Sequence, residues 1–203
     1  MTMRITTLAE NTAGGDPENI NWFFLAEYAL SILVEVEGST ILFDTGLSTS
    51  AVHNARLLGI DLSSVDKIVL SHGHEDHTGG LREVLRLTGP VEVIAHPDIW
   101  QLKYARIGDK QRYVGIPFRR QELESWGASF NLSREPVWIT DNIVTSGEVP
   151  MSTDYEIIDP ALFVKEGGRL HPDPVADDLA LIVKTGQGLV VILGCAHRGV
   201  VNT

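Results

Sequence analysis

The sequence predicts an α/β fold in a single domain, and two observations support that class. Strand-like and helix-like hydrophobic patterns alternate between residues 28 and 95, an order typical of helices packed on a sheet. The chain has 203 residues and 43% hydrophobic content, which supplies one sizeable core but is short for two full domains. We therefore expect one domain over residues 1–203.

The first elements along the chain are strands. Residues 3–8 alternate loosely between apolar and polar side chains and precede a polar, Gly-rich loop at 11–19. Residues 28–36 are rich in β-branched side chains, and Glu37-Gly38 separates them from another apolar run at 39–43. A two-residue connection of this kind predicts a β-hairpin.

A helix and further strands are expected after this hairpin. Residues 48–58 start with a serine suited to an N-cap and carry apolar side chains at helical spacing. A short buried strand is predicted at 65–70, a second helix at 81–87 and another strand at 91–95. This part of the chain carries the α/β signal.

The periodicity weakens between residues 98 and 135, where basic residues are interspersed with aromatic ones. We interpret this segment as an insertion or a lid. A solvated connector with ordinary basic side chains explains the same pattern equally well. Beyond it, strands are predicted at 137–139, 143–144, 179–183 and 189–193, the last two joined by a turn at 185–188.

Composition excludes some classes of protein. The chain has 16 basic and 27 acidic residues, a net charge of −11, so nucleic acid is a disfavoured partner. The N-terminal residues lack the pattern of a secretory signal, and no stretch approaches the ~20 apolar residues that span a bilayer. We expect a soluble, cytoplasmic protein that does not bind membranes. Its single cysteine, Cys195, is free for packing or for metal.

The chemistry is concentrated in the run from Ser71 to His77, which follows a predicted strand and precedes a predicted helix. Imidazole and carboxylate groups suit zinc, iron or manganese. In an extended segment His72 and His74 share a face and can bind one ion together. Asp76 and His77 start the next element and point to a neighbouring position that suits a second ion. Four such groups within six residues, flanked by glycines, favour metal over an exposed polar loop.

This HxHxDH spacing resembles the signature of the metallo-β-lactamase superfamily. Residues 41–46, which contain Asp44, resemble the first motif of that family, in which the aspartate lies beneath the metal site and orients it. Without the histidine motif, Asp44 would be interpreted as a carboxylate that caps a turn. The resemblance implies the αββα sandwich fold of the superfamily.

Two later segments are similar to one branch of the superfamily, the dihydropteroate-synthase-like metallo-hydrolases named after a methanopterin-precursor synthase. These segments are residues 177–181 and 194–202. The resemblance makes His197 a replacement for the third-motif histidine and places Cys195 where relatives have a bridging aspartate or a zinc-binding cysteine. Packing as a small buried side chain is the alternative for Cys195.

The remaining histidines carry weaker arguments. His171 lies near the expected position of the third-motif histidine, but its loop context favours a solvated residue, and we assign His53 and His96 to structure. Asp178 is a candidate for orienting the site, or simply the carboxylate that begins a strand.

The chain stops at Thr203, whereas the resemblance implies more strand and helix and a last metal-binding histidine. We therefore expect a sandwich that is truncated at the C-terminus. The second metal site would be incomplete, and its ion would bind more weakly than the first. An unclosed sheet edge would leave room for a homo-oligomer.

The function we expect is hydrolysis of an ester, a phosphoester or a related small-molecule substrate by a metal-bound hydroxide. Asp76 would bind metal and orient the water. The cofactors would be two divalent ions, zinc first, with manganese and iron as alternatives. An iron-dependent redox member of the superfamily and an inactive metal-binding homologue are the competing hypotheses. The residues expected to bind metal are His72, His74, Asp76, His77, Cys195 and His197.

We also expect the strand at 189–193 to bring Cys195 and His197 to the sheet edge that carries His72 and His74. The substrate itself is not encoded in a readable pattern, because residues that line the pocket vary within one fold.

Overall fold

The computed structural model describes residues 2–13 and 23–203. Its contacts divide the chain into two compact units. The first consists of Met1–Leu70, Glu75–Val93 and Phe118–Phe130, and the second of Ser71–His74, Ile94–Pro117 and Asn131–Thr203. The segment at 98–135 contributes to both units, and its role as a lid stays a prediction.

The first unit contains a six-stranded sheet in the order β1-β2-β3-β4-β5-β8. The β2–β3 hairpin turns at Glu37 and Gly38, whose φ angles of 52° and 82° suit a tight two-residue connection. β3 then pairs with β4 in parallel, so the chain must cross over between them through a helix. The strands are β1 (Met3–Ala9), β2 (Ser31–Val36), β3 (Ser39–Phe43), β4 (Lys67–Val69), β5 (Val91–Ala95) and β8 (Ala128–Leu132).

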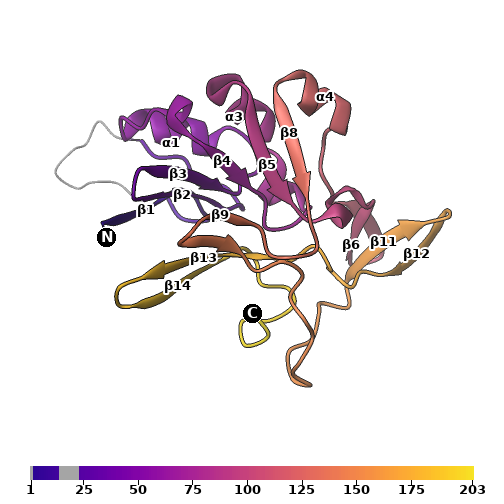
Figure 1. Ribbon diagram of the computed structural model, residues 1–203. Coiled ribbons are helices and arrows are strands. Elements are labelled where there is room, and N and C mark those ends of the chain that lie inside the picture. The colour runs from indigo at the N-terminus through magenta and orange to yellow at the C-terminus, as the bar shows by residue number, and fades with distance from the viewer. Residues whose placement is uncertain (1, 14–22) are drawn as a thin grey trace. The chain divides into compact units, whose positions relative to one another are not determined.

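Helices α1 (Ser50–Leu57), α3 (Leu81–Thr88) and α4 (Arg120–Ser125) lie along one face of this sheet (Figure 1). The central strands are apolar on both faces, with Ile41, Leu42 and Phe43 fully buried, as expected for strands covered on both sides. The short helices η1 (Leu62–Ser64) and α2 (Glu75–Thr78) complete the unit.

Two glycines allow α2 and α3 to approach the loop after β3. A Cβ atom on Gly79 would lie 2.1 Å from the carbonyl oxygen of Leu47, and one on Gly80 would lie 2.0 Å from that of Thr45. Because both obstacles are backbone atoms, neither position has room for a side chain.

The second unit contains two four-stranded sheets, in the orders β14-β13-β10-β9 and β12-β11-β6-β7. All their pairings are antiparallel. A 3₁₀ helix, η2 (Pro97–Trp100), precedes them. The strands are β6 (Lys103–Ile107), β7 (Lys110–Tyr113), β9 (Trp138–Thr140), β10 (Ile143–Thr145), β11 (Leu162–Glu166), β12 (Arg169–Pro172), β13 (Ala180–Thr185) and β14 (Gly188–Leu193).

The predicted elements at 3–8, 39–43, 48–58, 65–70, 81–87, 91–95 and in the C-terminal strands are present with boundaries shifted by a few residues. The strand expected from Tyr28 starts only at Ser31. Ala29 and Leu30 donate instead to the Asn11 side chain and to the Asp76 carbonyl oxygen, so their N–H groups do not bond to a neighbouring strand. Most of the loop expected at 11–19 lies outside the described residues.

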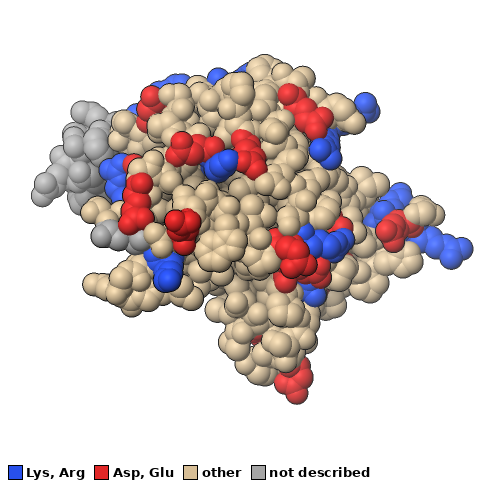
Figure 2. Space-filling model, in the orientation of Figure 1, with Lys and Arg blue, Asp and Glu red and all other residues tan. Residues whose placement is uncertain are grey.

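Acidic and basic side chains are interspersed on the face of the molecule that Figure 2 shows. Several form exposed ion pairs, such as Arg4 with Glu35 and Arg120 with Glu124. Exposed pairs of this kind contribute little to stability, because solvent and salt screen them. None of the helices in the described part of the chain has the length and apolar character needed to cross a bilayer.

Candidate metal centre

Two candidate ligands lie in the segment Ser71–His74, which belongs to the second unit. The His72 side chain is fully buried and that of His74 nearly so. His72 Nδ1 lies 2.9 Å from Ser71 Oγ, and its Nε2 lies 2.9 Å from His74 Nδ1. The two imidazoles therefore present ring nitrogens to each other, as the i, i+2 spacing predicted.

His197 joins this pair. Its ring centroid lies 4.8 Å from that of His72 and 4.9 Å from that of His74, and the two motif rings lie 4.5 Å apart. The interplanar angles of 73° to 88° arrange the rings edge to face instead of stacked. One ring nitrogen from each histidine lies within 4.8 Å of the other two.

This donor set fits a single divalent metal ion. Zinc–imidazole bonds of about 2.0–2.1 Å at a tetrahedral angle place two ligand nitrogens roughly 3.3 Å apart. His72 Nε2 and His74 Nδ1 lie 2.9 Å apart, and one nitrogen of each of the three rings lies within 4.8 Å of the others. Three protein ligands on one ion leave its fourth position for water or substrate, the arrangement of catalytic rather than structural zinc sites. His72, His74 and His197 are therefore the residues that could hold one ion.

Asp76 and His77 begin the next element, as predicted, and lie in α2 of the first unit. The buried His77 ring has Nδ1 2.6 Å from Asp44 Oδ2, and its Nε2 lies 3.6 Å from Asp76 Oδ2. Because the carboxylate of Asp44 can only accept, it fixes the proton on Nδ1 and leaves the Nε2 lone pair available. A carboxylate behind a histidine is the usual support of a metal-binding imidazole.

The backbone around Asp44 is held in a rare conformation. Its φ of 59° lies in the left-handed region, which few residues other than glycine adopt, and its side chain is fully buried. His77 is anchored by its own carbonyl oxygen, which accepts from both the N–H and the hydroxyl of Thr45. Local strain of this kind persists where the surrounding structure requires it, which is common at functional sites.

Cys195 lies in the second unit, two residues beyond the end of β14, and its side chain is exposed. Packing as a small buried side chain is therefore wrong for it. A ligand atom of His72 lies within 4.8 Å of its sulfur. A thiol at this distance can serve as a ligand for an ion near His72.

One expectation about strand placement is wrong. The strand before His72, β4, belongs to the six-stranded sheet, whereas β14 belongs to a four-stranded sheet. Cys195 and His197 therefore do not extend from the sheet that carries His72 and His74. His197 lies near the other two histidines in the segment after β14, where Ala196 has a positive φ of 49°.

The other histidines have structural contacts. His53 Nε2 lies 2.9 Å from the carbonyl oxygen of Phe23, and His171 is exposed, but on strand β12 and not in the expected loop. His96 is buried, and its Nδ1 accepts from the N–H of Asp98. Burial lowers the pKa of His96 despite the nearby carboxylate of Asp98, so this ring is neutral at neutral pH.

Three buried charged residues escaped the sequence prediction. Lys103 is fully buried, and its Nζ donates to Asp173 Oδ2 at 3.0 Å and to Asp177 Oδ1 at 2.8 Å. Burial alone would lower the pKa of Lys103, but the two carboxylates outweigh it and raise the pKa. The only hint in the sequence is the pair Asp177-Asp178 at the start of an apolar run.

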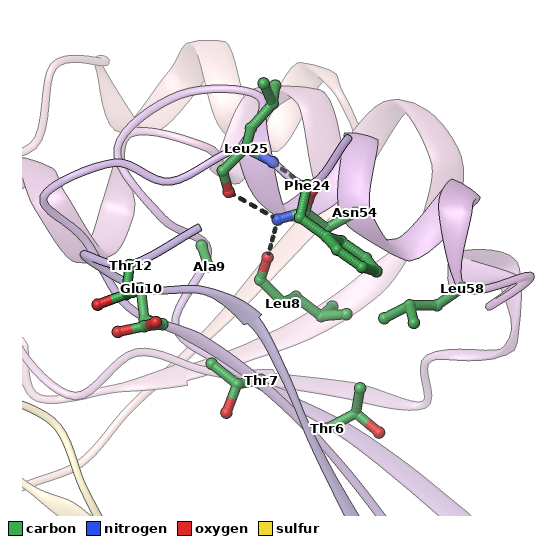
Figure 3. Close-up of a pocket in the computed structure, with 10 residues that line it drawn as sticks. All are labelled: Thr6, Thr7, Leu8, Ala9, Glu10, Thr12, Phe24, Leu25, Asn54 and Leu58. Carbon is green, nitrogen blue, oxygen red and sulfur yellow. Dashed lines mark hydrogen bonds between the residues drawn. The ribbon is translucent and has the colours of Figure 1, made fainter. Parts of the chain in front are cut away.

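A separate cavity of about 410 Å³ lies in the first unit beside β1 and α1 (Figure 3). Asn54 stands at its wall, where its side-chain amide donates to the carbonyl oxygens of Leu8 and Leu25. The residues that Figure 3 labels along its lining include no histidine or cysteine, so they do not supply the imidazole donors of the histidine cluster.

Comparisons with known proteins agree with this geometry. A family model described as the metallo-beta-lactamase superfamily matches residues 26–201. The chain is 33% identical over 213 residues to 7,8-dihydropterin-6-methyl-4-(beta-D-ribofuranosyl)-aminobenzene-5'-phosphate synthase of Methanocaldococcus jannaschii, covering 98% of this chain and 70% of that protein. An uncharacterized protein of the same organism is 36% identical over 182 residues, which cover 88% of this chain and 66% of that protein.

A solved structure gives the same result. The crystal structure of a metal-dependent hydrolase of the beta-lactamase superfamily matches with a TM-score of 0.79 and 32% identity. The match covers 99% of this chain and 69% of that chain. At this level of identity and coverage, both the fold and the family relation are shared.

Proposed function

The chain belongs to the metallo-beta-lactamase superfamily, and from that premise we propose that it is a metal-dependent hydrolase of ester, phosphoester or related small-molecule substrates. Members of this superfamily generally bind divalent metals and catalyse hydrolysis. The family resemblance and the metallo-β-lactamase fold expected from the HxHxDH motif are both confirmed. We propose the reaction, the identity of the metal and the number of ions bound.

The convergence of His72, His74 and His197 is the observation that carries this proposal. These three imidazoles would hold one ion, zinc in the first instance. A divalent metal bound there would lower the pKa of its water toward neutrality and polarise the substrate. Imidazole rings that are held in place by their surroundings position a metal ion better than side chains on a flexible loop could.

Asp76 and His77 are proposed as ligands of a second ion, and Cys195 is proposed as a further metal ligand. The Asp44 carboxylate, 2.6 Å from Nδ1 of His77, favours the tautomer with its proton on Nδ1, the form in which an imidazole binds metal through Nε2. The Asp76 side chain, 17% exposed, is accessible enough to orient a water molecule and to accept its proton at a carboxylate oxygen. Asp76 is therefore the proposed catalytic residue.

The test compares three purified variants with the parent protein. We expect His72→Ala and His74→Ala to lose most bound metal while keeping the parental circular dichroism, because neither side chain belongs to the apolar core. His171→Ala, which removes an exposed histidine from β12, is the matched control and should keep its metal. Elemental analysis and hydrolysis of p-nitrophenyl esters and bis(p-nitrophenyl) phosphate provide the readouts. Full metal content in both motif variants would refute the metal assignment.

A second candidate follows from the name of the Methanocaldococcus relative, which is a synthase and not a hydrolase. A synthase reaction of this kind would join the 6-methyl carbon of a dihydropterin to a phosphate-bearing aminobenzene riboside, with release of a leaving group from the pterin and a proton from the riboside. Metal-loaded protein that leaves every ester unchanged but joins these two reactants would favour this candidate. Bound iron with an absorbance change on reduction would instead favour a redox member of the family.

A further inference from the structure

The turn that leads into β13 contacts both chain segments that carry the three histidines. Asp177 Oδ2 accepts from the N–H of Gly73 at 2.7 Å, and the N–H of Leu179 donates to the carbonyl oxygen of Ser71 at 2.9 Å. Asp178 Oδ2 accepts from the N–H of Arg198 at 2.8 Å. Gly73 lies between His72 and His74, and Arg198 follows His197, so each bond is made next to a candidate ligand.

The two carboxylates are almost completely buried, with 1% exposure for Asp177 and 2% for Asp178. Burying a carboxylate is unfavourable unless hydrogen bonds and opposite charge compensate for the lost water. For Asp177 that compensation comes from one backbone N–H at Oδ2 and one ammonium group, Lys103, at Oδ1. Both of its oxygens are therefore engaged in holding the protein chain, which is the position of a supporting residue and not of a ligand.

The approach of Asp177 to the histidine segment depends on Gly73. A Cβ atom at position 73 would lie 2.4 Å from the carbonyl oxygen of Ile99 and 3.2 Å from Asp177 Oδ2. The segment is therefore packed between η2 and the carboxylate, and only a residue without a side chain can bring its N–H so close. The fixed backbone position of Gly73 in turn limits the backbone positions of its neighbours, His72 and His74.

We propose that Asp177 and Asp178 are positioning residues of the metal centre, which hold the segment of His72 and His74 in register with the segment of His197. Lys103 supplies the counter-charge that allows Asp177 to be buried as a carboxylate. The proposal rests on the proposed metal centre. A metal site tolerates errors of only about 0.5 Å in the positions of its ligand atoms, and here the three ligand nitrogens come from segments far apart in the sequence. The Asp177-Asp178 turn forms hydrogen bonds to both segments.

Cobalt(II) binding to the metal-free full-length chain tests this proposal, because cobalt reports both its affinity and its ligand geometry through its visible absorption. Asp177→Asn retains one acceptor oxygen but faces either Gly73 or Lys103 with an NH₂ group. We expect at least a tenfold loss of cobalt affinity and an altered spectrum, the size seen when outer partners of metal ligands are removed. The matched control is Asp173→Asn, which removes the same charge beside Lys103 but contacts neither ligand segment. It should bind within threefold of the parent.

A second pair of variants keeps the test decisive if Asp177→Asn does not fold. Asp178→Ala removes the acceptor for Arg198 N–H, whereas Asp178→Asn retains one. The alanine variant should lose affinity and the asparagine variant should recover it. Equal affinities and spectra in the parent, Asp177→Asn and Asp178→Ala would overturn the positioning role alone. A parent protein that gives no cobalt spectrum would overturn the proposed metal centre, and the positioning role with it.

Discussion

Replacement of Lys103 by methionine should destabilise the protein strongly, because it leaves two carboxylates buried without their cation. Lys103 has no exposed surface and donates at 2.8 and 3.0 Å to Asp177 and Asp173. Breaking a buried ion pair by removing one partner costs about 3–5 kcal/mol. With a urea m-value of about 2–3 kcal/mol/M, the unfolding midpoint should fall by roughly 1–2.5 M.

Urea denaturation of the metal-free protein, followed by tryptophan fluorescence, measures this shift. Lys165→Met is the control, since Lys165 is an exposed lysine on β11, the strand that pairs with β6. Its loss should cost less than about 1 kcal/mol. A midpoint for Lys103→Met within 0.3 M of the control, a margin of about 1 kcal/mol, would refute the reasoning.

The pH dependence of this difference follows from the direction of the shift. The folded-state pKa of Lys103 is raised above its ordinary value of 10.5. The lysine therefore contributes its full stabilisation below pH 10.5 and loses it only as the pH rises through the higher folded-state value. The difference between parent and Lys103→Met should stay constant from pH 7 to pH 9.

Three further changes have expected outcomes. Burial alone would raise the pKa of Glu27, but hydrogen bonds from Ser48 and other donors at the start of α1 outweigh it and lower the pKa. Glu27→Gln should therefore lower the free energy of unfolding by about 1 kcal/mol at pH 7, and thermal melts should show this difference disappearing as the pH falls below 4.5. A difference that stays constant with pH would show that Glu27 does not act as an ionised acceptor. Gly80→Ala should lower the free energy of unfolding in urea by about 3 kcal/mol or more, because its Cβ would meet a backbone oxygen at 2.0 Å. The control, Gly186→Ala, places its Cβ in open space and should cost less than about 0.5 kcal/mol. Equal costs would show that the close approach is absent. Asp76→Asn should reduce turnover of any identified substrate about 10- to 100-fold and metal content at the three-histidine site much less, and turnover at the parental rate would remove Asp76 from the mechanism.

The apolar strands and the histidine motif could be predicted because their chemistry is local. Residues 39–43 and 91–95 are short apolar runs beside turn residues, and they form β3 and β5. Asp76 and His77 could be placed at the start of a helix from their position before two glycines. In these cases neighbouring residues carry all the information.

The hairpins β6–β7 and β11–β12 could not be predicted, because their side chains are charged and their packing partners are distant in sequence. Arg106 lies over the Phe163 ring at 4.6 Å, and Lys165 lies near Tyr104, so basic side chains cover the aromatic ones. Such strands resemble a solvated connector when only the sequence is known.

Asp44 and Asp178 were named as candidates for orienting the site, whereas Lys103, Asp173 and the role of Asp177 were missed for a related reason. The sequence alone does not distinguish a buried lysine from an exposed one. Lys103 can be identified as buried and paired only in the folded structure, where Asp173 and Asp177, some seventy residues later, lie beside it. His197 was found through a family resemblance and not through local pattern. Its meeting with His72 and His74 depends on the loop after β14, which no periodicity describes.

The three-histidine cluster also has a consequence for the synthesis of the chain. His72 and His74 leave the ribosome well before His197, which is added more than a hundred residues later. At about 5–20 residues per second, this interval lasts roughly 6–25 s. During that time the nascent chain would present only two of the three ligands of the proposed metal site, which would hold an ion more weakly than the complete set. If the three histidines bind one ion, its loading should therefore follow translation of β14 and the loop that carries His197.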